Sequence, residues 1–161
     1  MVYGPRSNVW TETAFKVARL KPTPWIGNGS GHAHPIYIDD VVDMTALLAT
    51  HPQADGQAFN CAPDPPPTWR EYLGLYSSLA GHQRWLPIPT GLALTFAEGL
   101  MLFTPAGTRF KDAPAIIHAI CGSATFKMDK ARDLLGWRPK VDLQTGIANC
   151  APWLRERGLL H

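Results

Sequence analysis

The sequence lacks several features that would point directly to a function. It has only three cysteines, Cys61, Cys121 and Cys150, and no Cys-x-x-Cys pair, which excludes a zinc ribbon and a thioredoxin-type motif. Its 15 basic and 13 acidic residues are scattered, so the clustered positive charge that marks nucleic-acid binding or a polybasic membrane contact is absent. We therefore expect no nucleic-acid partner and no membrane partner.

Long apolar runs are also missing. The longest, residues 91–103, falls short of the roughly 20 residues that a membrane span needs, and it includes Glu98 and Gly99. Met1 is not followed by a charged and then apolar leader, so we expect reduced thiols and a cytoplasmic location. The chain is instead rich in glycine and proline, 14 and 15 of its 161 residues, which predicts many turns between short elements.

Hydrophobic periodicity predicts a helix-dominated chain with a few isolated short strands. Thr68 and Glu71 form a capping-box pattern at the start of one helix, Ser7 or Asn8 could cap the first, and Asp39 or Asp40 another. The strands are too few and too scattered to form a sheet of their own. Predicted helices cover residues 9–20, 40–50, 68–81, 91–103, 113–121, 129–135 and 143–157, and predicted strands cover 2–3, 36–38, 57–62 and 84–88.

Two histidines followed by two carboxylates form the first candidate site. His32 and His34, with Asp39 and Asp40 further along, could hold zinc or a related metal. A strand is predicted between the two pairs, and the aspartates stand where the next helix needs a cap. The interpretation as a loop and a cap is therefore favoured, and we assign no metal ligand.

Other catalytic patterns are incomplete. The glycine loop, residues 27–31, has no Lys-Ser/Thr pair after it and does not join a strand to a helix, so it is a plain turn or a ligand-facing turn. There is no Gly-x-Ser-x-Gly elbow, and Cys61 fits a small buried hydrophobe. No tyrosine has a lysine four residues later. The residues alone predict no catalytic and no cofactor-binding residue.

Four segments, in order along the chain, resemble one family. They are Val-Tyr-Gly-Pro-Arg at 2–6, the glycine loop with the following His-Pro-Ile-Tyr-Ile-Asp-Asp-Val at 27–41, Gly-Gln-Ala-Phe-Asn-Cys-Ala at 56–62 with Thr-Trp-Arg-Glu-Tyr at 68–72, and Phe-Lys-Met-Asp-Lys-Ala-Arg-Asp-Leu-Leu-Gly-Trp-Arg-Pro at 126–139. Each is similar to a motif of the extended short-chain dehydrogenases/reductases, the NAD-dependent epimerase/dehydratase type.

The resemblance implies a Rossmann-like α/β fold of which this chain is the C-terminal, substrate-binding part. Residues 1–62 would include remnants of the last Rossmann strands, and residues 63–161 would form a helical lid. NAD(P) is the cofactor of that family, but its glycine-rich loop, catalytic Ser/Thr and Tyr-x-x-x-Lys have no counterpart in these 161 residues. We therefore expect no cofactor on this chain alone. The implied partners are a small-molecule substrate and either a separate N-terminal Rossmann half or a second copy of the chain.

The predicted substrate contacts come from two places in the sequence. Tyr3 and Arg6 follow a predicted strand end, where α/β proteins bind ligands, and Trp25, His32 and His34 come next. Sugar-nucleotide members of the family often place an arginine for the diphosphate where this chain has Ala33, which argues against such a substrate.

The resulting hypothesis is the substrate-binding part of an NAD(P)-dependent oxidoreductase or epimerase that acts on a sugar or a small hydroxylated substrate and is inactive as an isolated chain. The alternatives are a non-enzymatic interaction module, half of a split enzyme, and a metal-dependent hydrolase that uses His32 and His34.

Overall fold

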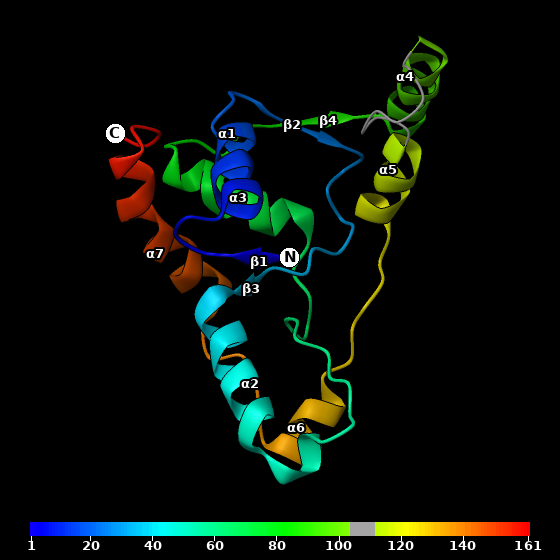
Figure 1. The fold of residues 1–161 in the computed structure, drawn as a ribbon. Coiled ribbons are helices and arrows are strands. Elements are labelled where there is room, and N and C mark those ends of the chain that lie inside the picture. The colour runs from blue at the N-terminus through cyan, green and yellow to red at the C-terminus, as the bar shows by residue number, and fades with distance from the viewer. Residues whose placement is uncertain (104–111) are drawn as a thin grey trace.

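The computed structural model describes residues 1–103 and 112–161 and shows a helix-rich α/β fold with a few short strands, as predicted (Figure 1). The first predicted helix is divided into a π-helical segment and one short α-helix, and the other predicted helices are present. In chain order the elements are β1 (Val2–Tyr3), η1 (Asn8–Thr13), α1 (Ala14–Ala18), β2 (Thr23–Ile26), β3 (Ile36–Tyr37), α2 (Ile38–Thr50), η2 (Pro52–Ala54), α3 (Trp69–Leu79), β4 (Trp85–Ile88), α4 (Thr90–Phe103), α5 (Ala113–Cys121), α6 (Asp129–Leu135) and α7 (Leu143–Glu156).

The strands form two separate parallel pairs. β1 pairs with β3, so that Tyr3 stands opposite Tyr37, and β2 pairs with β4, so that Thr23 stands opposite Trp85. Parallel neighbours need long crossover connections, which here are supplied by the helical segments between them. Two strands are marginal alone, so both pairs depend on the helices packed against them.

The larger core is built from aromatic side chains, and we call it the tyrosine core. Helices α1, α3 and α7 enclose the β1–β3 pair, and the ring of Tyr3 meets those of Tyr37 and Tyr72 edge to face, with centroids 5.5 and 5.9 Å apart. Gly146 lets α7 approach closely, because a Cβ there would lie 2.1 Å from the Tyr3 hydroxyl oxygen. The fully or nearly fully buried members include Phe15, Tyr76, Ile147, Cys150 and Leu154.

A second, smaller core lies at the other end of the molecule, and we call it the methionine cluster. It joins β3, α2, η2 and α6, and Figure 1 shows α2 and α6 below the β1–β3 pair. Its buried members are Ile36, Met44, Ala54, Ala62, Met128, Ala131, Leu135 and Trp137.

The remaining helices, α4 and α5, contact each other at the side of the molecule away from α2 and α6 (Figure 1). Leu92 and Phe96 on α4 and Ile116 on α5 are 64%, 71% and 53% exposed. Within residues 1–103 and 112–161, no helix has the length and hydropathy required to cross a membrane.

Two local predictions are wrong. Residues 57–62 do not form a strand. Asn60 of this segment donates to the carbonyl of Lys127, and Lys130 of α6 donates to the carbonyl of Ala58. Side-chain hydrogen bonds to the residues around α6 therefore hold the segment, where a strand would need a paired backbone. Neither Asp39 nor Asp40 caps α2, whose N-cap is Tyr37.

The remaining cap predictions divide. Ser7 occupies the N-cap of η1, but its hydroxyl donates to the carbonyl of Val2 and makes no capping bond. The capping box at Thr68 and Glu71 is confirmed, because the Thr68 hydroxyl accepts from the backbone of Glu71 while the Glu71 carboxylate accepts from the backbone of Thr68.

Candidate functional site

The glycine loop, residues 27–31, follows β2 on the way to β3 and is hydrogen-bonded to the start of α3. Gly29 has φ +78°, and a Cβ there would lie 2.7 Å from the Trp85 ring. Its carbonyl accepts from the backbone of Arg70, and the carbonyl of Gly31 accepts from the backbone of Trp69, both at 2.9 Å. First-turn N–H groups of a helix have no partner within the helix. The loop supplies such partners, and this places α3 directly against it.

The two predicted histidines lie side by side at the end of this loop. Their ring centroids are 6.5 Å apart, and the Nδ1 of His32 lies 3.1 Å from the carbonyl oxygen of Ala124. The ring of His34 meets Phe126 edge to face at 4.7 Å, and burial lowers its pKa. Within the described ranges, no group of three or more His, Cys, Asp or Glu side chains is placed to hold a metal ion.

Trp25 lies on the other side of the glycine loop, on β2. Its ring packs on Trp69 with the centroids 5.0 Å apart, and Trp69 in turn contacts Trp10 and Tyr72. The backbone N–H of Trp69 donates to the carbonyl of Gly31, and His32, which follows Gly31, forms a β-bridge with Thr68. Three predicted site residues, Trp25, His32 and His34, therefore lie around the glycine loop.

Tyr3 and Arg6 lie elsewhere. Tyr3 is 1% exposed in the tyrosine core, where burial and the nearby Cys150, Tyr37 and acidic groups raise its pKa. Arg6 is exposed in the turn after β1 and has the left-handed φ of +70°, a conformation that is uncommon outside glycine. Among the described contacts, none joins either residue to the histidines.

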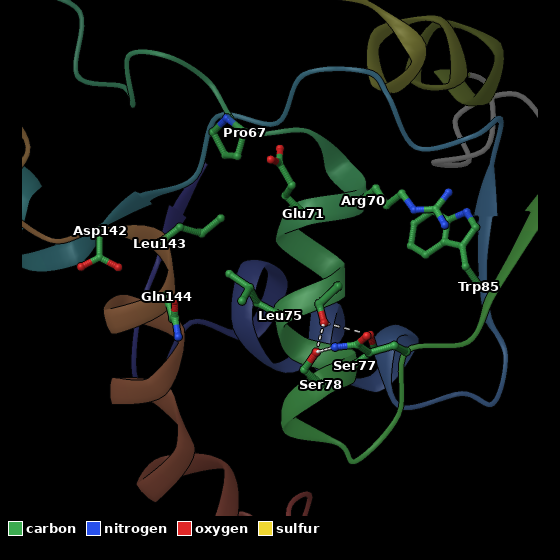
Figure 2. Close-up of a pocket in the computed structure, with 12 residues that line it drawn as sticks. Pro67, Arg70, Glu71, Leu75, Ser77, Ser78, Trp85, Asp142, Leu143 and Gln144 are labelled. Carbon is green, nitrogen blue, oxygen red and sulfur yellow. Dashed lines mark hydrogen bonds between the residues drawn. The ribbon is translucent and has the colours of Figure 1, made fainter.

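Two cavities flank these elements. The first, of about 640 Å³, lies along the outer face of α3 between the start of α7 and Trp85 (Figure 2). Ser77 and Ser78 both donate to the carbonyl of Gly74 there, and Gln83 donates to Ser78. At its other end the Arg70 guanidinium lies over the Trp85 ring, 5.4 Å from the centroid. The cavity therefore offers hydroxyl, amide and guanidinium groups, together with the carboxylates of Glu71 and Asp142, which are bonded to Thr68 and Thr145, but no arranged nucleophile and base.

The second cavity, of about 560 Å³, lies between Tyr3 and the segment that follows α6. Two of its cations already have acidic partners: Arg132 pairs with Asp129 and Asp133, and Lys140 pairs with Asp43 at 2.9 Å. Its wall is held by Asp40, which is 2% exposed and accepts from the backbone N–H groups of Lys140 and Val141 at 2.8 and 3.2 Å. This aspartate is therefore a structural anchor.

Sequence reasoning missed Trp69, Trp85 and Phe126, which complete the surroundings of the predicted residues. Trp69 is assigned by periodicity to a helix face, and Trp85 and Phe126 lie in segments far along the chain from the glycine loop. The only local signal was the place of Trp85 in the predicted short strand at residues 84–88, which does not identify a partner.

Comparison with known proteins shows which class has this fold. No protein-family model matches the sequence. The chain is 29% identical over 133 residues to sterol-4-alpha-carboxylate 3-dehydrogenase erg26, decarboxylating, of Schizosaccharomyces pombe, a match that covers 78% of this chain and 36% of the yeast protein. It is 27% identical over 178 residues to the enzyme of the same description from Candida albicans, covering 96% and 48%.

Solved structures show the same architecture. The epimerase Mth375 of Methanothermobacter thermautotrophicus superposes with a TM-score of 0.68 at 21% identity, covering 98% of this chain and 41% of that one. The UDP-glucose 4-epimerase of Thermotoga maritima superposes with a TM-score of 0.65, also at 21% identity, covering 97% and 44%. The fold is thus that of part of a Rossmann-like epimerase or reductase.

The proteins that the chain matches in sequence and in fold are dehydrogenases and epimerases, which confirms the resemblance of the four motifs to the extended short-chain dehydrogenases/reductases of the NAD-dependent epimerase/dehydratase type. The chain spans less than half the length of the curated relatives it matches.

Proposed function

We propose that this chain forms the substrate-binding part of an NAD(P)-dependent oxidoreductase or epimerase. The observation that carries the proposal is the gathering of Trp25, His32 and His34 around a glycine loop that also fixes the start of α3. Trp69 and Phe126, from segments far along the chain, join these three residues, and the set combines aromatic surface with a few polar groups, the usual composition of a small-molecule site.

The same surroundings favour a largely apolar, hydroxylated substrate over a sugar nucleotide. Ala33 is fully buried between the two histidines, and residues 27–34 contain no lysine or arginine, so Arg70 is the one guanidinium described next to this loop. The side chains nearby are instead aromatic: Trp25, Trp69 and Phe126. The names of the two yeast relatives, which describe dehydrogenases of sterol carboxylates, agree with this preference.

We further propose that these 161 residues do not transfer hydride by themselves. They contain neither the glycine-rich dinucleotide loop nor a tyrosine with a lysine four residues later, the pair in which the lysine lowers the pKa of a tyrosine acid/base. The chain's part is then to bind and orient the substrate against a nucleotide-binding unit.

Titration calorimetry of the purified chain tests this proposal. We expect sodium cholate, a hydroxylated fused-ring carboxylate, to bind, and UDP-glucose and NADH to give no saturable heat. His34→Ala should weaken cholate binding severalfold, whereas His118→Ala, an exposed position on α5, should not change it. Saturable binding of UDP-glucose would contradict the substrate assignment. NAD(P)-dependent turnover by the chain alone would disprove the proposal that these residues only bind and orient the substrate.

A second function, as an interaction module or as half of a split enzyme, is favoured by one observation. Leu92 and Phe96 lie one helical turn apart on α4, and both they and Ile116 on α5 are more than half exposed. Apolar side chains grouped in this way favour association. Native mass spectrometry of the chain, alone and with a separately expressed Rossmann half, distinguishes self-association from complementation.

A further inference from the structure

Two tryptophans stand on one face of the β2–β4 pair. Thr23 is opposite Trp85, and Trp25 is opposite Pro87. Opposed residues of neighbouring strands point to the same side of a sheet, and side chains two apart in one strand do so as well. Trp25 and Trp85 therefore project together from the side of this pair that carries Thr23.

The start of α3 packs against that same face. Trp69, its first residue, places its ring 5.0 Å from that of Trp25, and Arg70 places its guanidinium over Trp85 (Figure 2). Gly29 permits this approach, since a Cβ there would meet both Trp85 and Arg70. The indoles of Trp25 and Trp85, on the strand pair, and of Trp69, on α3, thus form a layer where the helix meets the strands, and Trp85 also lines the 640 Å³ cavity.

All three indole N–H groups in this layer are buried and have no hydrogen-bond acceptor among the described residues. An unpaired buried donor costs about 1–3 kcal/mol, and the great majority of buried polar atoms in proteins are paired. In contrast, Trp137 in the methionine cluster donates its indole N–H to Asp43 at 3.0 Å. Three such groups in one layer are consistent with a site whose acceptors come from a ligand.

We propose that the indole N–H groups of Trp25 and Trp85 donate hydrogen bonds to oxygen atoms of the substrate and thereby select a flat, oxygen-bearing ring system. The ring of Trp69, at the start of α3, packs against Trp25. This inference rests on the proposed function and identifies the groups that give it specificity. The indole rings provide a flat apolar contact surface, and the hydrogen bonds from their N–H groups orient the ligand.

Arg70 defines one end of the ligand. Its guanidinium forms no ion pair among the described residues and lies beside the Trp85 ring at the edge of the 640 Å³ cavity. A ligand carboxylate placed there would be bound by a cation and by the Trp85 N–H together. The class of ligand is therefore a hydroxylated, fused-ring carboxylate.

Replacement of single tryptophans by phenylalanine tests the proposal, because it keeps an aromatic ring and removes the N–H. We expect Trp25→Phe and Trp85→Phe to weaken sodium cholate binding about 5- to 10-fold, the size of one lost hydrogen bond, while the melting temperature of the ligand-free chain stays equal or rises. Trp137→Phe, which removes a paired N–H, should lower the melting temperature and leave cholate affinity unchanged.

The indole N–H resonances provide a direct readout. Cholate should shift those of Trp25 and Trp85 in a ¹H–¹⁵N spectrum and leave that of Trp137 in place. If the wild-type chain binds cholate and both phenylalanine variants bind it equally well, the inference is wrong while the proposed function stands. If the wild-type chain binds no cholate at all, both are wrong. A lower melting temperature for Trp25→Phe without ligand would show that its N–H has a partner within the protein, which also overturns the inference.

Discussion

The two cores of the molecule are held together in different ways. The tyrosine core is closed by rings packed edge to face, and Phe15, Tyr72 and Tyr76 within it are at most 1% exposed. The methionine cluster has few rings, and charged side chains on α2 define its boundary, with Asp40 and Asp43 binding the segment that follows α6. The comparison shows that one end depends on side-chain shape and the other on a few long-range hydrogen bonds.

The largest loss of stability is expected for a substitution that disrupts the tyrosine core. Phe15→Ala should lower the free energy of unfolding by about 3–5 kcal/mol, because it removes a buried ring that packs on Tyr76 and leaves a cavity. The matched control is Phe96→Ala, whose ring is 71% exposed and whose loss should change stability by less than about 0.5 kcal/mol. Urea unfolding monitored by circular dichroism measures both. Equal losses would contradict the assignment of Phe15 to a closed core.

A smaller effect is expected at the methionine cluster. Asp40→Ala should lower the free energy of unfolding by about 2–3 kcal/mol, since it leaves the backbone N–H groups of Lys140 and Val141 without their acceptor. Asp39→Ala, one residue earlier and exposed in the first turn of α2, should cost about 0.5 kcal/mol through the helix dipole alone. Similar losses in the free energy of unfolding for the two variants would show that Asp40 acts only as a charge at the helix end.

The smallest effect concerns the candidate site at the glycine loop. Burial lowers the pKa of His34, so the folded chain binds fewer protons there than the unfolded chain. Its contribution to stability is therefore complete above the ordinary histidine pKa of 6.5 and is lost as the pH falls below that value. Melting temperatures between pH 8 and pH 5 should fall less steeply for His34→Gln than for the wild-type chain. His118→Gln should retain the wild-type slope, and a change equal to that of His34→Gln would contradict this prediction.

Local patterns predicted most of the helices because their signals lie within a few residues. The capping box at Thr68 and Glu71 and the left-handed Gly136 after α6 are read directly from the sequence. The predicted strand at residues 57–62 could not be rejected from local signals, because a strand forms only where another segment pairs with its backbone. That segment is instead bound by Asn60 and Lys130 to residues around α6.

The candidate site was predictable only in part for the same reason. Trp25, His32 and His34 flank one visible motif, the glycine loop, and the structure brings them together. Tyr3 follows the same rule of strand ends, yet it faces the tyrosine core, because the register of β1 against β3 sets its direction. No single-sequence pattern contains that register, nor the packing of Trp69 on Trp25 and of Arg70 on Trp85.

The parallel pairing of β2 with β4 also bears on how the chain folds during synthesis. Residues 23–26 leave the ribosome well before residues 85–88, and all of α3 lies between them. The edge of β2 therefore stays unpaired until α3 and β4 have emerged, and such long-range pairings form slowly. In that interval Trp25 has neither its strand partner nor the ring of Trp69, so this part of the nascent chain exposes an unpaired edge and an apolar ring to which a chaperone can bind.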